Sequence, residues 1–352
     1  MSFPVFNYFY PHLLLFLPLA MGALINNDYN DNNSNHIMSR SPTNEHISYD
    51  NTKDWPIKYP ECVGNRQSPI EISHRQAIDI EAPPIWFGLY DVPMAKPIVL
   101  HNSGHTVQFQ VPTTSLGRGR PFITGGRLQG KYVVEQTHFH WGSAGRKGSE
   151  HALNGRRYDL EMHIVHYDAK HGNVNVAKNF ANGIAVIAVL FQVAKRLDVD
   201  QPGLEVILKN LKDVQVADTS VTATEIFSLG SLLANVDRAD FYTYQGSLTT
   251  PPCTETVTWI VFAHVLPILR SDLKKFWDLK DSKGNRYVNT RSLQSNLDRN
   301  VYHIGHFTVR GSAWNFGGFI IKHIETLDNL HPMDEVFISK GQACALGSIQ
   351  EV

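Results

Sequence analysis

Two stretches of this chain alternate polar and apolar residues with the period of a β-strand. They cover residues 135–142 and 160–166, and both contain β-branched and aromatic side chains. Residues two apart in a strand point to the same face, so His138 and His140 share one face of the first strand. His163 lies on one face of the second strand. If the two strands are neighbours in a sheet, three imidazoles converge.

Three neutral imidazoles that leave a fourth position open are typical of a catalytic zinc site rather than a closed structural one. The alternative is that these are ordinary hydrogen-bonded histidines, because the chain contains 17 of them. Gln136 and Glu161 favour the metal interpretation, since each lies two residues before a predicted ligand and on the same face. An amide or carboxylate oxygen there can accept the ring N–H that faces away from the metal. The pattern therefore predicts Zn²⁺ as the cofactor.

Other parts of the chain predict further elements of secondary structure. Residues 184–193 form a continuous apolar run, which is the pattern of a strand buried on both faces. Residues 201–222 carry apolar side chains at helical spacing between Leu204 and Leu211 and predict a surface helix. Residues 113–130 are rich in Gly, Arg and Ser and predict a solvated loop.

Length and charge limit the possible functions. The 352 residues with 42% hydrophobic content suffice for one large domain or two small ones, and dispersed motifs without an internal repeat favour one domain with extensions. The formal net charge of −1 gives no electrostatic reason to expect binding to nucleic acid or to an acidic membrane surface. We therefore expect a small-molecule partner and no nucleic acid.

The N-terminus resembles a secretion signal. Residues 13–23 form a short apolar run that ends in small residues and contains Pro18, too short to span a bilayer comfortably. We predict a signal peptide over residues 1–23, although no Lys or Arg occurs among residues 1–12, and a signal anchor is the alternative. We therefore expect a secreted protein whose mature chain has no membrane span.

Two extensions flank the predicted domain. Residues 24–52 are rich in Asn, Asp, Ser and Tyr and predict a flexible polar arm, in which Asn32 begins an N-glycosylation sequon. Residues 305–352 form a C-terminal extension whose role the sequence does not predict. This extension lacks the hydrophobic tail that a lipid-anchor signal would need.

The motifs together resemble the signature segments of the alpha-class carbonic anhydrases. The resemblance runs from about Trp55 to Arg299, with the segments in the family's order and at similar spacing. It implies a catalytic domain over residues 53–304 of a mixed, β-dominated α+β class. In that class a large, mostly antiparallel twisted central sheet carries short surface helices. The matching segments are residues 136–142, Ser149-Glu150-His151, residues 161–166 and residues 246–252.

This resemblance implies a zinc enzyme that reversibly hydrates carbon dioxide to bicarbonate and a proton by attack of zinc-bound hydroxide. It assigns His105 as the proton shuttle, and it implies that Glu150 accepts the hydroxyl proton of Thr249, which then orients the hydroxide. Asn289 would lie in a segment behind the metal ligands. Taken singly, the apolar members of the predicted substrate site could equally be core residues. That site comprises Val165, Val186, Leu248, Thr249, Thr250, Val257 and Trp259.

The resemblance also implies a disulfide between Cys62 and Cys253, for which two free buried thiols are the alternative. Cys344 is left over and could be free or could link to another chain. The chain departs from the family pattern near its start, where the usual Trp-x-Tyr is absent. Tyr49 is the nearest substitute for that tyrosine.

Two other functions stay open at the level of sequence. One is a secreted matrix or binding protein on the same scaffold with incidental catalysis, for which the polar arm and the C-terminal extension would bind the partner. The other is a zinc-dependent esterase that uses the same hydroxide on activated esters.

Overall fold

The computed structural model describes residues 48–305, 314–316 and 319–321. The predicted signal peptide, most of the polar arm with Asn32, and most of the C-terminal extension with Cys344 lie outside these residues, and their assignments stay predictions.

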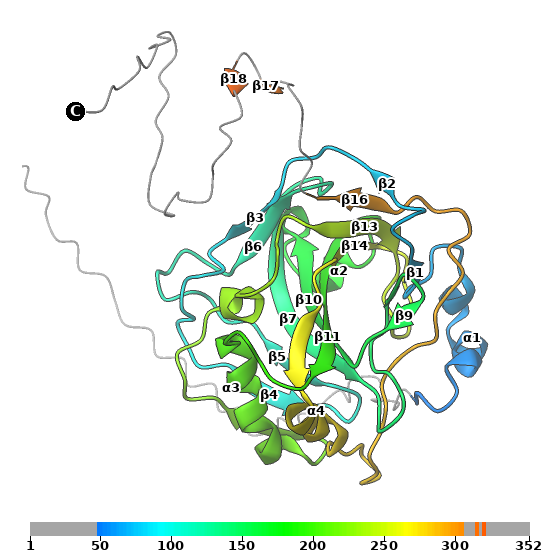
Figure 1. The fold of residues 1–352 in the computed structure, drawn as a ribbon, viewed down its shortest axis with the longest axis vertical. Helices are drawn as coiled ribbons and strands as arrows, with labels where there is room; N and C mark the ends of the chain where they lie inside the picture. The colour runs from blue at the N-terminus through cyan, green and yellow to red at the C-terminus, as the bar shows by residue number, and fades with distance from the viewer. Residues whose placement is uncertain (1–47, 306–313, 317–318, 322–352) are drawn as a thin grey trace, which may run out of the picture. The chain divides into compact units, whose positions relative to one another are not determined.

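A large mixed sheet of 13 strands forms the centre of the fold (Figure 1). Three pairs of neighbouring strands in it are parallel: β11 (Ile184–Ala194) with β14 (Val257–Phe262), β11 with β15 (Leu266–Leu269), and β16 (Tyr302–Ile304) with β2 (Ile78–Asp79). The other neighbouring strands are antiparallel. Off the main path through the sheet, β15 pairs with β11, and β6 (Phe122–Gly125) joins β3 (Ile85–Gly88) to β7 (Tyr132–Trp141). This confirms the predicted fold class. In spatial order, the main path consists of β12 (Thr219–Thr222), β4 (Val99–Asn102), β5 (Val107–Gln110), β7 (Tyr132–Trp141), β10 (Leu160–Asp168), β11 (Ile184–Ala194), β14 (Val257–Phe262), β13 (Phe241–Gly246), β16 (Tyr302–Ile304) and β2 (Ile78–Asp79).

The remaining elements are short. A three-stranded sheet contains β1 (Glu71–Ile72), β8 (Ala152–Leu153) and β9 (Arg156–Arg157), and a separate antiparallel pair contains β17 (Trp314–Phe316) and β18 (Phe319–Ile321). The α-helices are α1 (Trp55–Lys58), α2 (Val174–Ala177), α3 (Pro202–Asn210) and α4 (Arg270–Trp277). The 3₁₀-helices are η1 (Thr52–Asp54), η2 (Pro60–Val63), η3 (Ala169–His171), η4 (Leu211–Val214) and η5 (Leu229–Leu233). Among the described residues, no helix has the length and apolar character needed to cross a membrane.

The two faces of the sheet contribute to two different clusters of buried side chains. Phe139 and Ile164 belong to the larger cluster, together with Ile187. Val165 and Val186 belong to the second cluster, on the face that also carries the histidines. Because β11 alternates between both clusters, its continuous apolar run is buried on both faces, as predicted.

Two predicted elements differ from the structure. The helix predicted over residues 201–222 ends much earlier, because α3 passes into η4 and residues 219–222 form strand β12. These four residues alternate between half-buried and exposed positions and pair with β4, which suits the β-branched side chains of Thr219, Val221 and Thr222. The loop predicted over residues 113–130 contains strand β6, because Ile123 is fully buried in the larger cluster.

The predicted disulfide is present and joins two distant parts of the chain. The S–S bond between Cys62 and Cys253 is 2.03 Å long and spans 191 residues of sequence. Trp55 packs with both cysteines in a small third cluster, and Tyr49 and Tyr59 lie against it. The first described residues are thereby packed near the segment that follows Thr249.

Candidate metal centre and active cleft

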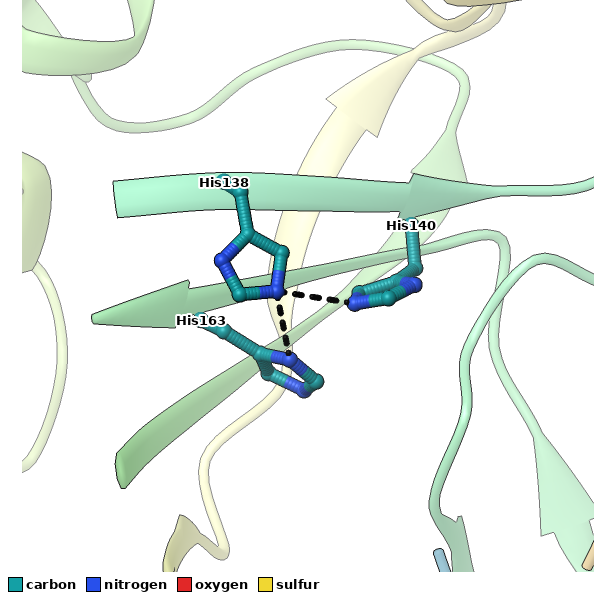
Figure 2. A group of neighbouring side chains, drawn as sticks. All are labelled: His138, His140 and His163. Carbon is teal, nitrogen blue, oxygen red and sulfur yellow. Dashed lines mark hydrogen bonds between the residues drawn. The ribbon is translucent and has the colours of Figure 1, made fainter. Parts of the chain in front are cut away.

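The three predicted zinc ligands converge on one face of the sheet (Figure 2). Strands β7 and β10 are antiparallel neighbours, and His138 lies directly opposite His163 in their register. His140 follows two residues later on β7 and therefore points to the same side. Nε2 of His138 lies 3.1 Å from Nε2 of His140 and 3.2 Å from Nδ1 of His163.

The outer nitrogen of each imidazole faces an acceptor, which fixes the position of its proton. His138 donates from Nδ1 to Oε1 of Gln136 (3.0 Å), and His163 donates from Nε2 to Oε1 of Glu161 (2.7 Å). His140 donates from Nδ1 to the backbone oxygen of Asn289 (2.7 Å). The inner nitrogen of each neutral ring therefore carries a lone pair and no proton.

This arrangement fits a metal ion. Three lone pairs that face one another at this spacing cannot form hydrogen bonds among themselves, whereas a cation would satisfy all three. His140 and His163 are each 1% exposed, so bulk water does not compensate for them. Three nitrogen ligands in this pattern suit Zn²⁺ with one open position.

Burial also favours the neutral rings that a metal requires. Burial lowers the pKa of His138 well below its usual value, and the neighbouring His140 and His163 lower it further. Burial likewise lowers the pKa of His163, followed by the effect of His140, although Glu161 opposes this shift. The rings of His138 and His163 are thus held in the unprotonated form that binds a metal ion at neutral pH.

Glu161 is the most heavily hydrogen-bonded carboxylate near the centre. Oε1 accepts from His163 and from Nδ1 of His151 (2.6 Å), and Oε2 accepts from the backbone N–H groups of Glu150 and His151 (2.7 and 2.8 Å). Burial by itself raises the pKa of Glu161, but the charge of His151 and the hydrogen bonds from both histidines outweigh it and hold this pKa well below the usual value. Glu161 therefore stays ionised and keeps His163 in one tautomer.

Asn289 connects several parts of the centre through its side chain as well as its backbone. Its Oδ1 accepts from the backbone N–H of Trp141 (2.7 Å). Its Nδ2 donates to the backbone oxygens of His105 (2.9 Å) and Phe139 (2.8 Å). Since the backbone oxygen of Asn289 also accepts from His140, one fully buried residue holds strand β7 and the His105 loop together.

Glu150 lies beside this centre with one oxygen unpaired. Its Oε1 accepts from the backbone N–H of Arg291 (2.9 Å). Its Oε2 is buried, has no hydrogen-bond partner within the described part of the chain, and lies 3.5 Å from Nε2 of His140. No hydrogen bond joins Glu150 to Thr249 among those of the described residues, so the orienting contact implied by the resemblance stays a prediction.

A cleft of about 410 Å³ opens beside His138 and His163. Its lining combines an apolar wall with amide and carboxylate groups. Thr249 and Thr250 also line the cleft, whereas Val257, predicted to belong to the substrate site, is fully buried and does not line it. The apolar wall consists of Val165, Val186, Leu248 and Trp259.

His105 and Tyr49 line a second, smaller cavity of about 90 Å³. Gln108, on strand β5 three residues after His105, lines the larger cleft instead. Burial raises the pKa of Tyr49 well above its usual value, and the charge of Glu150 raises it further. Tyr49 thus shares a cavity with His105 despite the atypical start of the domain.

The sequence did not identify every residue of the cleft. Glu135, Gln110, Val174 and Asn175 line it as well. Glu135 is in the strand motif, but strict alternation would point it away from Gln136. Val165 of β10 pairs with Gln136 of β7, but the next residue, His166, pairs with Val134. Glu135 is therefore left without a partner in the register, as in a β-bulge, and it lines the cleft beside Gln136.

Comparisons with known proteins agree with this geometry. Residues 50–305 match the family described as eukaryotic-type carbonic anhydrase. Carbonic anhydrase 15 of Mus musculus is 36% identical over 246 residues, which cover 69% of this chain and 74% of that protein. Carbonic anhydrase 6 of Homo sapiens is 32% identical over 270 residues, which cover 71% of this chain and 82% of that protein. Carbonic anhydrase 12 of Homo sapiens is 33% identical over 228 residues, which cover 64% of this chain and 60% of that protein.

Proposed function

Because the chain belongs to the eukaryotic-type carbonic anhydrase family, we propose that it is a zinc metalloenzyme that reversibly hydrates carbon dioxide to bicarbonate and a proton. The observation that supports this most directly is the convergence of three unprotonated imidazole nitrogens beside a cleft with an apolar wall. Zinc bound by His138, His140 and His163 would act as a Lewis acid that lowers the pKa of a coordinated water to about 7, a magnitude known from carbonic anhydrases themselves.

The chain's own residues orient the reactants. Carbon dioxide has no net charge, and weak contact with Val165, Val186 and Trp259 holds it without trapping it. Thr249 lines the same cleft, and its hydroxyl can accept a hydrogen bond from the attacking oxygen if it gives its own proton to Glu150. The unpaired, buried Oε2 of Glu150 supports this assignment, because it has capacity for one more donor.

His105 completes the proton transfer in this proposal. An imidazole can accept and release a proton near neutral pH, and His105 is half-buried and lines a cavity of its own with Tyr49. The hydrogen bond from Asn289 to the His105 backbone holds this loop next to strand β7. We infer that His105 carries the proton from the cleft to bulk solvent.

We also propose that the protein is secreted. The apolar run at the N-terminus supports secretion, and so does the disulfide between Cys62 and Cys253, because disulfides persist mainly in oxidising compartments.

The test compares the full chain with a His138→Ala variant. We expect the wild-type protein to carry about one zinc ion per chain and to hydrate carbon dioxide, measured by stopped-flow with a pH indicator, and the variant to lose both. His101→Ala is the matched control, because His101 on strand β4 is hydrogen-bonded to Ser220 of β12 and does not line the cleft. A wild-type protein that binds zinc but hydrates carbon dioxide no faster than buffer would refute the proposed function.

A further inference from the structure

A buried chain of hydrogen bonds leads away from the metal centre through Glu161. Beyond Glu161, Nδ1 of His151 lies 2.6 Å from the carboxylate, and Nε2 of His151 lies 2.7 Å from the hydroxyl of Tyr244. Tyr244 is on strand β13, which is separated from β10 by β14 and β11 in the sheet. Two intermediate side chains thus connect His163 to a strand three places away.

The same hydroxyl also contacts the segment before Thr249. Tyr244 donates to Oγ of Ser68 (2.9 Å), and that oxygen accepts from the backbone N–H of Ser247 (3.0 Å). Oγ of Ser247 in turn accepts from the backbone N–H of Ser68 (2.9 Å). This reciprocal pair fixes the backbone two residues before Thr249.

Every member of this chain is buried. Glu161, His151, Ser68 and Ser247 are 0% exposed, and Tyr244 is 2% exposed. A polar group that loses its partner in such surroundings is not compensated by bulk water. Removing the Tyr244 hydroxyl would leave both Nε2 of His151 and Oγ of Ser68 without this contact. The Tyr244 hydroxyl therefore contacts both branches, His151 on one side and Ser68 on the other.

We propose that Tyr244 is a positioning residue that holds the Glu161–His163 pair on one side and the Ser247–Thr249 segment on the other. This inference rests on the proposed function for the identity of the metal. It does not require that the protein hydrates carbon dioxide, because retention of zinc is measured separately. Residues that orient metal ligands through hydrogen bonds typically change metal affinity or activity by about 10- to 100-fold when mutated.

Packing alone could also explain why Tyr244 is buried. Its ring stacks with that of Trp259, with centroids 6.4 Å apart, and the guanidinium of Arg299 lies 5.6 Å from the ring centroid. A Tyr244→Phe substitution keeps both contacts and removes only the hydroxyl. The substitution therefore separates the hydrogen-bond role from the packing role.

Tyr242 provides a matched control on the same strand. It lies two residues before Tyr244, is 5% exposed, and its hydroxyl contacts Nδ1 of His74 (3.0 Å), away from the Glu161 branch. Tyr242→Phe therefore removes an equivalent hydroxyl from the same face of β13 without touching the chain of bonds to Glu161.

The experiment measures the rate at which the zinc-loaded full chain releases zinc to an excess of chelator. We expect Tyr244→Phe to release zinc about tenfold faster than the wild type, and Tyr242→Phe to match the wild type. With cobalt(II) in place of zinc, we expect the visible spectrum to change in Tyr244→Phe alone, because the geometry of the ligands changes.

Equal release rates in the wild type and Tyr244→Phe would overturn the proposal, as would equal acceleration by Tyr242→Phe. If Tyr244→Phe does not fold, Ser68→Ala replaces it, because this variant keeps the tyrosine and removes its next partner. Faster release of zinc from folded Ser68→Ala than from Tyr242→Phe would support the proposal, and no difference would refute it.

Discussion

Oε2 of Glu150 shows how the surroundings of a single residue can define its chemistry. The carboxylate is 0% exposed, one oxygen is bonded to the backbone of Arg291, and the other has no partner among the described residues. Buried carboxylate oxygens seldom go unpaired unless they serve a function. The predicted donor is Thr249, which lies in the cleft beside the metal centre.

This assignment predicts different effects for two substitutions of Thr249. Thr249→Val removes the hydroxyl at similar volume, and we expect kcat/KM for carbon dioxide hydration to fall by about 100-fold because the attacking oxygen is no longer oriented. Thr249→Ser keeps the hydroxyl and should stay within about tenfold of the wild type. Zinc content should be unchanged in both. An equal loss in both variants would show that the hydroxyl is not what matters.

Strand β10 places histidines in two different environments. His163 faces the metal centre, whereas His166 points to the other side of the sheet. There its Nδ1 donates to the backbone oxygen of Ala185 (3.3 Å), and its Nε2 accepts from the hydroxyl of Tyr90 (2.5 Å). Burial lowers the pKa of His166 to about 3. A strand that binds a metal on one face thus has a neutral core histidine on the other.

The lowered pKa of His166 predicts a loss of stability in acid. The unfolded chain takes up a proton near the usual pKa of 6.5, but the native chain does not until the pH approaches 3. Stability therefore falls as the pH drops through this window, by about 1.4 kcal/mol per pH unit between roughly pH 6 and 4.

Urea unfolding of the zinc-free protein between pH 7 and 4 measures this effect. In His166→Gln, which still offers an acceptor to Tyr90, the pH dependence should be weaker by that amount. His264→Gln, at an exposed position, is the control and should keep the wild-type pH dependence. Identical pH profiles for the wild type and His166→Gln would contradict this prediction.

At the scale of the whole molecule, the described domain contains all residues of the proposed site. The three ligands, their hydrogen-bond acceptors, Glu150, Thr249 and His105 all lie within residues 48–305. The disulfide between Cys62 and Cys253 joins the start of this domain to the segment after Thr249. Tyr49, which lines the cavity with His105, is the one residue named near the site that comes from the predicted polar arm, and it lies in the described part of the chain.

A chain reduced to residues 48–305 should therefore keep its catalytic activity. We expect kcat/KM for carbon dioxide hydration to stay within about twofold of the full chain, because the domain has its own core and closes its own site. Stopped-flow assays on both chains, with circular dichroism to confirm folding, make the comparison. A folded domain that has lost most of its activity would contradict this prediction and would favour an essential role for the extensions.

The sequence by itself predicted the parts of this protein that depend on local periodicity. Alternation with a period of two placed His138 and His140 on one face of their strand, and it placed His163 on one face of the neighbouring strand. The continuous apolar run of β11 indicated burial on both faces, because successive side chains of a strand point to opposite faces. The resemblance to known carbonic anhydrases added the disulfide partners, which no local pattern could have paired.

Only the tertiary structure decided the features that depend on contacts between distant segments. The β-bulge that turns Glu135 into the cleft arises from the pairing of β7 with β10, and residues 219–222 form a strand because β4 is available as a partner. The chain of bonds from Glu161 to Ser247 requires strands that are far apart in sequence. Hydrogen-bond partners of this kind are set by the packing of the sheet, which the order of residues along one strand does not reveal.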